Sequence, residues 1–160
     1  MATAYLGIGS NIGDRDENFK AALRHLESTG RIKIKKNSRF YHTKPVGGPP
    51  QEDYLNGVLE VETDFSPFEL LGALKEIEAK MGREPFARDH PRIIDMDILL
   101  YNGLVLEDKS LVIPHPGMHL RYFVLKGLAE IAQEAVHPVS GRTVKELYCE
   151  VSQGFPPKGG

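Results

Sequence analysis

The sequence predicts an α+β fold, in which helices pack on a sheet dominated by antiparallel strands. Apolar residues recur at every second position in some segments and at helical spacing in others, and these segments follow in the order β-α-β-β-α-β. The dipeptide Asn102-Gly103 lies between two apolar runs, which is a strong sequence signal of a β-hairpin. Because 160 residues suit one domain, we expect residues 1–151 to form a single domain and residues 152–160 to be a disordered tail.

The N-terminal part of the chain is predicted to contain two strands with one helix between them. Residues 4–8 alternate as a strand does, and a glycine-rich turn follows. Asp14 with Glu17 three residues later resembles a capping box, and apolar residues then recur at helical spacing down to residue 28. Residues 32–42 again alternate, which predicts the second strand.

The central part of the chain is predicted to contain a loop, a strand and a helix. Residues 43–53 are so rich in proline and glycine that we expect a loop. The third strand follows, with Leu55, Leu59 and Val61 on one face and Tyr54 and Asn56 on the other. Ser66, Pro67 and Glu69 have the spacing of a helix start, and Gly82 ends the predicted helix.

The C-terminal part of the chain is predicted to add one strand, a hairpin and two helices. Residues 94–101 form the fourth strand, and the turn at Asn102 is predicted to send residues 104–106 back along it. A helix over residues 118–131 and a shorter one over residues 144–148 follow. This order of elements resembles the split β-α-β, ferredoxin-like plan with an extra β-hairpin.

Composition excludes several classes of function. A net charge of −2 provides no basic surface for a nucleic acid, and the single cysteine, Cys149, excludes an internal disulfide framework and a cysteine-based zinc cluster. No apolar run approaches the ~18 residues of a membrane-spanning helix, and the N-terminus does not resemble a secretion signal. We therefore expect a cytoplasmic protein, a monomer or a dimer, with small-molecule substrates and no nucleic-acid or membrane partner.

The stretch of residues 83–97 carries the strongest chemical signal. Asp95 and Asp97 begin the fourth strand two residues apart, so both carboxylates are predicted to share one face, opposite the apolar side chains Met96, Ile98 and Leu100. Mg²⁺ binds one or two carboxylates together with phosphate oxygens, and arginine forks match phosphate geometry. With three arginines just before the acid pair, the stretch predicts a phosphoryl-transfer site. The alternative is a solvent-facing strand edge that carries charges.

Several short motifs occur in order along the chain. They are Gly9-Ser10-Asn11, Tyr54-Leu55-Asn56, Gly82-Arg83, the stretch Pro-Arg-Ile-Ile-Asp-Met-Asp-Ile-Leu-Leu-Tyr over residues 91–101, and Pro114-His115 with Arg121 and Phe123. From about residue 4 to residue 147 the chain thereby resembles the 6-hydroxymethyl-7,8-dihydropterin pyrophosphokinases of the folate pathway. The resemblance implies transfer of the β,γ-pyrophosphoryl group of ATP to the hydroxymethyl group of the pterin, with release of AMP and with two Mg²⁺ ions.

The resemblance also implies roles for individual residues. Asp95 and Asp97 would bind the magnesium ions and, with Arg83 and Arg92, would form the catalytic group. The implied ATP-binding residues are Glu78, Arg83, Arg88, Arg92, Ile98, His115 and Arg121. The implied pterin-binding residues are Thr43, Pro45, Val46, Tyr54, Asn56 and Phe123.

Ordinary structural roles stay open for several of these residues. Arg92 could form surface ion pairs, His115 could simply start a helix, and Val46 and Phe123 could pack in the core. Asn56 favours a ligand contact more clearly, because asparagine is disfavoured in the middle of a strand without a partner.

The predicted loop over residues 84–91 departs from the pattern of the family. Asp89 and His90 stand where relatives usually have a tryptophan and a glycine, and the chain contains no tryptophan. Phe86 or His90 would have to cover the substrates in place of an indole, so the way in which this loop closes is left open.

Two other classes of function are also open. Gly7-Ile8-Gly9 follows a strand and precedes a helix, as in a dinucleotide-binding oxidoreductase, but Gly13 arrives one residue late for that motif. A non-catalytic sensor of small molecules on the same fold is the other alternative, because a fold alone fixes no activity. A sensor does not need an acid pair beside arginines, and formation of AMP from ATP would distinguish the enzyme from both.

Overall fold

A computed structural model describes residues 1–10, 13–43, 54–82, 93–118 and 122–154 of the chain. The elements are β1 (Ala2–Ser10), α1 (Arg15–Ser28), β2 (Ile32–Asn37), β3 (Tyr41–Thr43), β4 (Tyr54–Thr63), α2 (Pro67–Lys80), β5 (Asp95–Tyr101), β6 (Leu106–Glu107), β7 (Val112–Ile113), α3 (Tyr122–Ala132) and α4 (Val144–Gly154). The main sheet has the strand order β2-β4-β1-β5, and β3 also pairs with β4. All these pairings are antiparallel, which confirms the predicted α+β fold.

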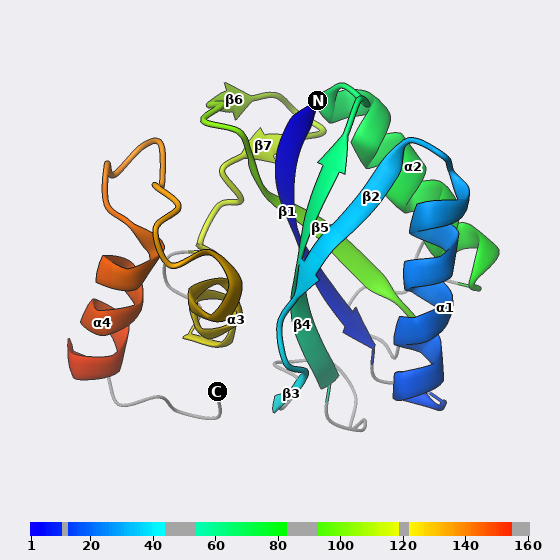
Figure 1. Ribbon diagram of the computed structural model, residues 1–160, viewed down its shortest axis with the longest axis horizontal. Helices are drawn as coiled ribbons and strands as arrows, with labels where there is room; N and C mark the ends of the chain where they lie inside the picture. The colour runs from blue at the N-terminus through cyan, green and yellow to red at the C-terminus, as the bar shows by residue number, and fades with distance from the viewer. Residues whose placement is uncertain (11–12, 44–53, 83–92, 119–121, 155–160) are drawn as a thin grey trace.

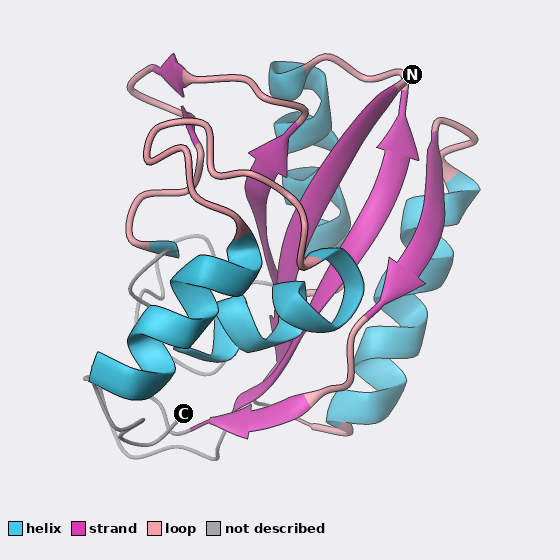
Figure 2. Cartoon of the chain, turned by 60° about the vertical axis from the view of Figure 1, so that its left-hand side comes forward, coloured by secondary structure: helices cyan, strands magenta, loops and turns pink. Residues whose placement is uncertain are grey.

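Helices cover both faces of the main sheet. In Figure 1, α1 and α2 lie to the right of the sheet, and α3 and α4 lie to its left. Figure 2 turns the second pair of helices to the front. Each face buries its own apolar cluster: Leu6 and Ile8 of β1 belong to the cluster under α1 and α2, whereas Val58 and Leu99 belong to the one under α3 and α4. The sheet is therefore the middle layer of three.

The two long helices begin where the sequence predicts. The Asp14 side chain accepts a hydrogen bond from the amide of Glu17 at 3.1 Å, and α1 starts at the next residue. At α2, the Ser66 hydroxyl accepts from the amide of Glu69 at 3.2 Å while the Glu69 carboxylate accepts from the amide of Ser66 at 2.9 Å. This reciprocal pair is a capping box, so both predicted helix starts are confirmed.

The predicted second strand is wrong in one respect, because it is interrupted in its middle. Strand β2 ends at Asn37 and β3 begins at Tyr41. Between them the buried Ser38 binds β4 in place of regular strand pairing. Its amide donates to the carbonyl of Val58 at 2.9 Å, and its hydroxyl accepts from the amide of Val58 at 2.9 Å. The alternation of apolar and polar residues over residues 32–42 does not reveal that a side-chain hydroxyl accepts the hydrogen bond in place of a backbone carbonyl.

The predicted return strand over residues 104–106 is also wrong as a partner of β5. A turn does form, since Asn102 has a positive φ of 50° and the amide of Leu104 donates to the carbonyl of Tyr101 at 3.0 Å. The Asn102 side chain, however, accepts from the amide of Thr3 at 2.9 Å and so is bound to β1. The chain leaves the sheet here, and the hairpin forms further on, between β6 and β7.

The C-terminal helices differ from the prediction at their ends. Met118 precedes α3 rather than belonging to it, and its amide donates to the carbonyl of His115 at 3.2 Å. Helix α4 continues to Gly154, well beyond the predicted residues 144–148. Among the helices of the described ranges, none combines the length and the apolar character that a bilayer crossing requires.

Candidate active site

The acid pair lies at the beginning of β5, on one face of the sheet. Asp95 and Asp97 are partly exposed, whereas Met96 and Ile98 between and after them are buried in the cluster under α1 and α2. The predicted alternation is therefore confirmed for these four residues. Both carboxylates point to the opposite side of the sheet, where α3 and α4 lie.

The prediction fails for Leu100, which shares the side of the acid pair. The register between β1 and β5 shifts between Tyr5 and Leu6, so that Tyr5 pairs with Leu100 and Leu6 pairs with Ile98. Leu99 is the extra residue of a β-bulge, and both Leu99 and Leu100 belong to the cluster under α3 and α4. A bulge is set by the partner strand, so strand alternation alone could not predict it.

Two glycines of β1 add no side chain of their own beside the acid pair. The register places Gly9 opposite Asp95, and Gly7 opposite Asp97. On the other side of β1, Gly9 is opposite Asn56 of β4. Asn56, Gly9 and Asp95 thus form one row across three strands, with the two outer Cα atoms about 9–11 Å apart by ordinary strand spacing. The sequence analysis did not predict this row, although the spacing of Gly7 and Gly9 by two residues was visible.

A bulge and a backbone hydrogen bond place His115 next to the acid pair. The amide of His115 donates to the carbonyl of Leu99 at 2.9 Å. Its Nε2 atom lies 3.9 Å from the Oδ2 atom of Asp97, and 20% of its side chain is exposed, against 48% for Asp97. Its Nδ1 atom is buried and has no hydrogen-bond partner within the described residues. The structure therefore brings His115 and the acid pair together, as the motif resemblance implies.

Glu78 reaches the same strand from helix α2. Only 3% of this residue is exposed, and its Oε2 atom accepts a hydrogen bond from the amide of Met96 at 2.7 Å. The sequence placed Glu78 on or beside the apolar stripe of its helix, which its burial confirms. Its partner could not be predicted, because the packing of α2 against β5 creates the contact.

Two of the predicted pterin-side residues, Asn56 and Phe123, lie on this face. Asn56 is partly buried, and its Cα partners are Gly9 on β1 and Tyr41 on β3. Thr43 and Tyr54 pair with each other next to it, and only their backbones are described. Phe123 lies in the first turn of α3 and packs against the cluster on the same side of the sheet as the acid pair.

Ile98 is not brought to the acid pair, and other predicted site residues lie outside the described part of the chain. The side chain of Ile98 is buried on the opposite face, so an ATP contact at this position would involve its backbone. Six residues lie outside the described ranges, namely Pro45, Val46, Arg83, Arg88, Arg92 and Arg121, as does the predicted loop over residues 84–91.

The described residues provide a metal site of two carboxylates at most. They contain no group of three or more histidine, cysteine, aspartate or glutamate side chains that could hold a metal ion. Asp95 and Asp97 fit Mg²⁺, which binds one or two carboxylates and completes its shell with phosphate and water oxygens. The donor set is therefore that of a cation that binds together with a nucleotide.

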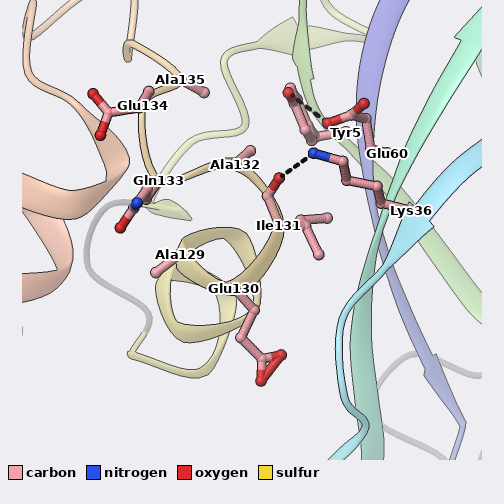
Figure 3. Close-up of a pocket in the computed structure, with 10 residues that line it drawn as sticks. All are labelled: Tyr5, Lys36, Glu60, Ala129, Glu130, Ile131, Ala132, Gln133, Glu134 and Ala135. Atoms are coloured by element: carbon pink, nitrogen blue, oxygen red, sulfur yellow. Dashed lines mark hydrogen bonds between the residues drawn. The ribbon is translucent and has the colours of Figure 1, made fainter.

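A separate open pocket of about 730 Å³ lies between the end of α3 and the sheet (Figure 3). Tyr5, Lys36 and Glu60 line it from the strands, and residues 129–135 line it from the helix side. The Tyr5 hydroxyl donates to Glu60 at 3.1 Å, and the Lys36 ammonium donates to the carbonyl of Ile131 at 3.4 Å. Burial and the nearby Glu60 carboxylate raise the pKa of Tyr5 to about 12. None of the lining residues belongs to the predicted site.

Comparison with known proteins gives a consistent result. Residues 5–133 match the sequence model of the family described as 7,8-dihydro-6-hydroxymethylpterin-pyrophosphokinase. A 2-amino-4-hydroxy-6-hydroxymethyldihydropteridine pyrophosphokinase of Methylorubrum extorquens is 42% identical over 151 residues, which cover 94% of each chain. The enzyme of the same name from Bacillus subtilis is 43% identical over 131 residues, covering 82% of this chain and 78% of its own.

Solved structures with the same fold are more distant in sequence. A Plasmodium falciparum HPPK-DHPS with pteroate superposes with a TM-score of 0.76 at 16% identity and covers 99% of this chain. A second HPPK-DHPS structure, in complex with substrates, has a TM-score of 0.74 at 17% identity. The present chain spans less than half of these proteins, 46% of the first and 44% of the second. They support the fold alone.

Proposed function

This chain belongs to the 7,8-dihydro-6-hydroxymethylpterin-pyrophosphokinase family, and we propose that it transfers the β,γ-pyrophosphoryl group of ATP to 6-hydroxymethyl-7,8-dihydropterin in folate biosynthesis. The pterin hydroxyl oxygen would attack the β-phosphorus, and the bond from that phosphorus to the oxygen of the α-phosphate would break. AMP leaves with that oxygen, and the hydroxyl proton is released. The chain is thus a diphosphotransferase rather than a phosphotransferase.

The row of Asn56, Gly9 and Asp95 is the observation that supports this reaction best. A flat heterocycle that hydrogen-bonds the Asn56 amide is proposed to lie across Gly9, because a glycine carries no side chain of its own. Its hydroxymethyl group would then point toward Asp95 and Asp97. A few aimed polar groups around a planar surface are typical of small-molecule sites.

The acid pair is proposed to bind two Mg²⁺ ions together with ATP. Bound magnesium would neutralise the triphosphate and align the attacking and leaving oxygens. The chain itself contributes fixed geometry: Asp95 and Asp97 are anchored on a strand whose intervening side chain, Met96, is buried in the core. Fixed charges that need no reorganisation during the reaction are an effective source of catalysis.

The remaining roles follow from the family pattern. We propose that arginine side chains bind phosphate oxygens, where planar guanidinium forks fit best, and that His115 belongs to the same ATP side. Glu78 would act on this side through the strand that carries the acid pair. The arginines are Arg83, Arg88, Arg92 and Arg121. The pterin would contact Asn56 together with Thr43, Pro45, Val46, Tyr54 and Phe123, while Ile98 contacts ATP through its backbone.

The proposed enzyme is one catalytic domain over residues 1–151. Both core clusters lie within these residues, and the reaction as written uses a single copy of the site. We propose a monomer, or a dimer of independent sites, that works in the cytoplasm.

Nucleotide product analysis tests the proposal. The protein is incubated with ATP, Mg²⁺ and the pterin, and the nucleotides are separated by chromatography, with reactions lacking either Mg²⁺ or the pterin as controls. AMP that forms only in the complete reaction is the expected result. ADP would show transfer of a single phosphoryl group, and binding of both ligands with no nucleotide turnover would indicate a sensor.

A further inference from the structure

Glu78 makes a contact that the proposed reaction does not account for. It is a carboxylate on α2, almost fully buried, among apolar neighbours of the same helix such as Leu74 and Ile77. Burying a charge is costly unless the group is hydrogen-bonded, so a carboxylate at this position calls for a specific partner. The backbone amide of Met96 donates a hydrogen bond to its Oε2 atom at 2.7 Å.

The position of that amide is informative. Met96 lies between Asp95 and Asp97, and its side chain is 4% exposed. Strand β5 is at one end of the strand order β2-β4-β1-β5, so among the described residues no strand pairs with its outer edge in the main sheet. The Glu78 carboxylate takes the place of a strand partner at the Asp95–Met96 peptide, the first of the two peptide units between the acids.

Holding this peptide restrains the backbone from which both acid side chains project. Side chains on a strand project from the backbone in directions set by the pleat, so the peptide between two residues controls how their side chains diverge. On the inner edge of β5, Gly9 and Gly7 provide the strand partners of Asp95 and Asp97 but no side chains. The outer edge is held at this point by Glu78.

We propose that Glu78 is a positioning residue, which holds the amide of Met96 and thereby sets the spacing and direction of the Asp95 and Asp97 carboxylates for a divalent cation. The inference rests on the proposed function, in which these carboxylates bind Mg²⁺. Removing a group that orients metal ligands without binding the metal itself typically lowers metal affinity or activity by about 10-fold to 100-fold.

Metal affinity is the readout that separates this role from a nucleotide contact. Mn²⁺ binding to the full-length protein is measured by electron paramagnetic resonance in the presence of a non-hydrolysable ATP analogue, for wild type, Glu78→Ala and Glu78→Gln. Affinity for the analogue is measured separately at saturating metal. Glu76→Ala is the control, because Glu76 is exposed on the same helix and pairs only with Lys80 among the described residues.

The Ala variant is expected to lose about 10-fold or more in Mn²⁺ affinity while analogue affinity at saturating metal stays near wild type. The Gln variant, which keeps an acceptor oxygen, should recover most of the loss, and the Met96 amide should exchange hydrogen faster in the Ala variant alone. If the Ala variant does not fold, Glu78→Asp replaces it, because the shorter side chain keeps the charge but does not reach the amide.

Two results would overturn the proposal. Unchanged Mn²⁺ affinity in the Ala variant would make Glu78 a core residue without influence on the acid pair. A loss confined to analogue affinity would make it a nucleotide contact only. A wild-type protein that binds Mn²⁺ and the analogue but forms no AMP would instead contradict the proposed function, and the metal affinities of the variants would still decide the role of Glu78.

Discussion

The Nε2 atom of His115 lies 3.9 Å from the Oδ2 atom of Asp97. This relationship joins segments that are separated by the β6–β7 hairpin, and the β-bulge at Leu99 makes it possible by directing a carbonyl to the amide of His115. The imidazole of His115 thereby lies beside the acid pair, on the face of the sheet that carries α3 and α4.

His115→Ala should weaken ATP binding and leave pterin binding close to wild type. The imidazole adjoins Asp97, where the phosphates are proposed to bind. A lost hydrogen bond to a charged phosphate costs about 1.5–3 kcal/mol, which is roughly a 10-fold to 150-fold loss of affinity. The bond from its backbone to Leu99 stays in place, so the fold should be retained. Isothermal titration calorimetry with each ligand measures the two affinities. His25→Ala, on the far face of the sheet in α1, is the control, and an equal effect of both substitutions would refute the assignment.

Asn56→Ala should weaken pterin binding by about 1–3 kcal/mol, because a buried polar edge of the ligand would lose its partner. ATP affinity should change little, since Gly9 and the acid pair stand between Asn56 and the phosphates. Calorimetry with the pterin and a non-hydrolysable ATP analogue tests both statements. The control is Asn37→Ala, at an exposed position of β2. A loss of ATP affinity as large as the loss for the pterin would contradict the placement of the pterin at Asn56.

Two helical glycines should respond to alanine in opposite ways. A Cβ atom at Gly127 of α3 would lie 2.7 Å from Val58 Cγ2 and 3.3 Å from Ser38 Oγ, so Gly127→Ala should destabilise the fold by about 1–3 kcal/mol. A Cβ atom at Gly72 of α2 meets nothing within 4 Å, so Gly72→Ala should stabilise it by about 0.5–1 kcal/mol. Urea unfolding measures both. Similar changes in the free energy of unfolding would show that α3 does not pack this closely on the sheet.

Alkaline pH should reveal the Tyr5–Glu60 pair. Burial, followed by the Glu60 carboxylate, raises the pKa of Tyr5 from 10.0 to about 12. Because the folded-state pKa is raised, the contribution to stability is fully present below about pH 10 and is lost as the pH rises toward about 12. Tyr5→Phe should therefore lose less stability than wild type across this interval, as measured by urea unfolding at several pH values. Parallel pH profiles would show that burial and Glu60 do not raise the pKa of Tyr5 in the folded protein.

Local patterns predicted a large part of the fold. Capping at Asp14 and Ser66 and the alternation of β4 depend on residues close together in the sequence, and both predictions are confirmed. The break at Ser38 and the bulge at Leu99 depend on partner strands instead. Such features arise only when the sheet is assembled, so a single strand does not reveal them.

The candidate site divides in the same way. That Asp95 and Asp97 share a face follows from the period of a strand and needed no structure. The row through Gly9 needs the register of three strands, and the contact of Glu78 needs the packing of a helix against a strand edge. Site features formed by residues close together in the sequence were therefore predictable, whereas features formed by residues from different strands and helices were not.

Single-turnover formation of AMP by Asp95→Asn and Asp97→Asn tests the central claim most directly. Asparagine keeps the size of the side chain and removes its charge, and Asp16→Asn, at an exposed position of α1, is the control. With saturating ATP, Mg²⁺ and pterin, each site variant is expected to form AMP at least about 100-fold more slowly than wild type, as other fixed charge-stabilising groups do when removed, while the control stays near wild type. AMP formation near the wild-type rate in either site variant would contradict the account, because the acid pair would then not be the reaction centre.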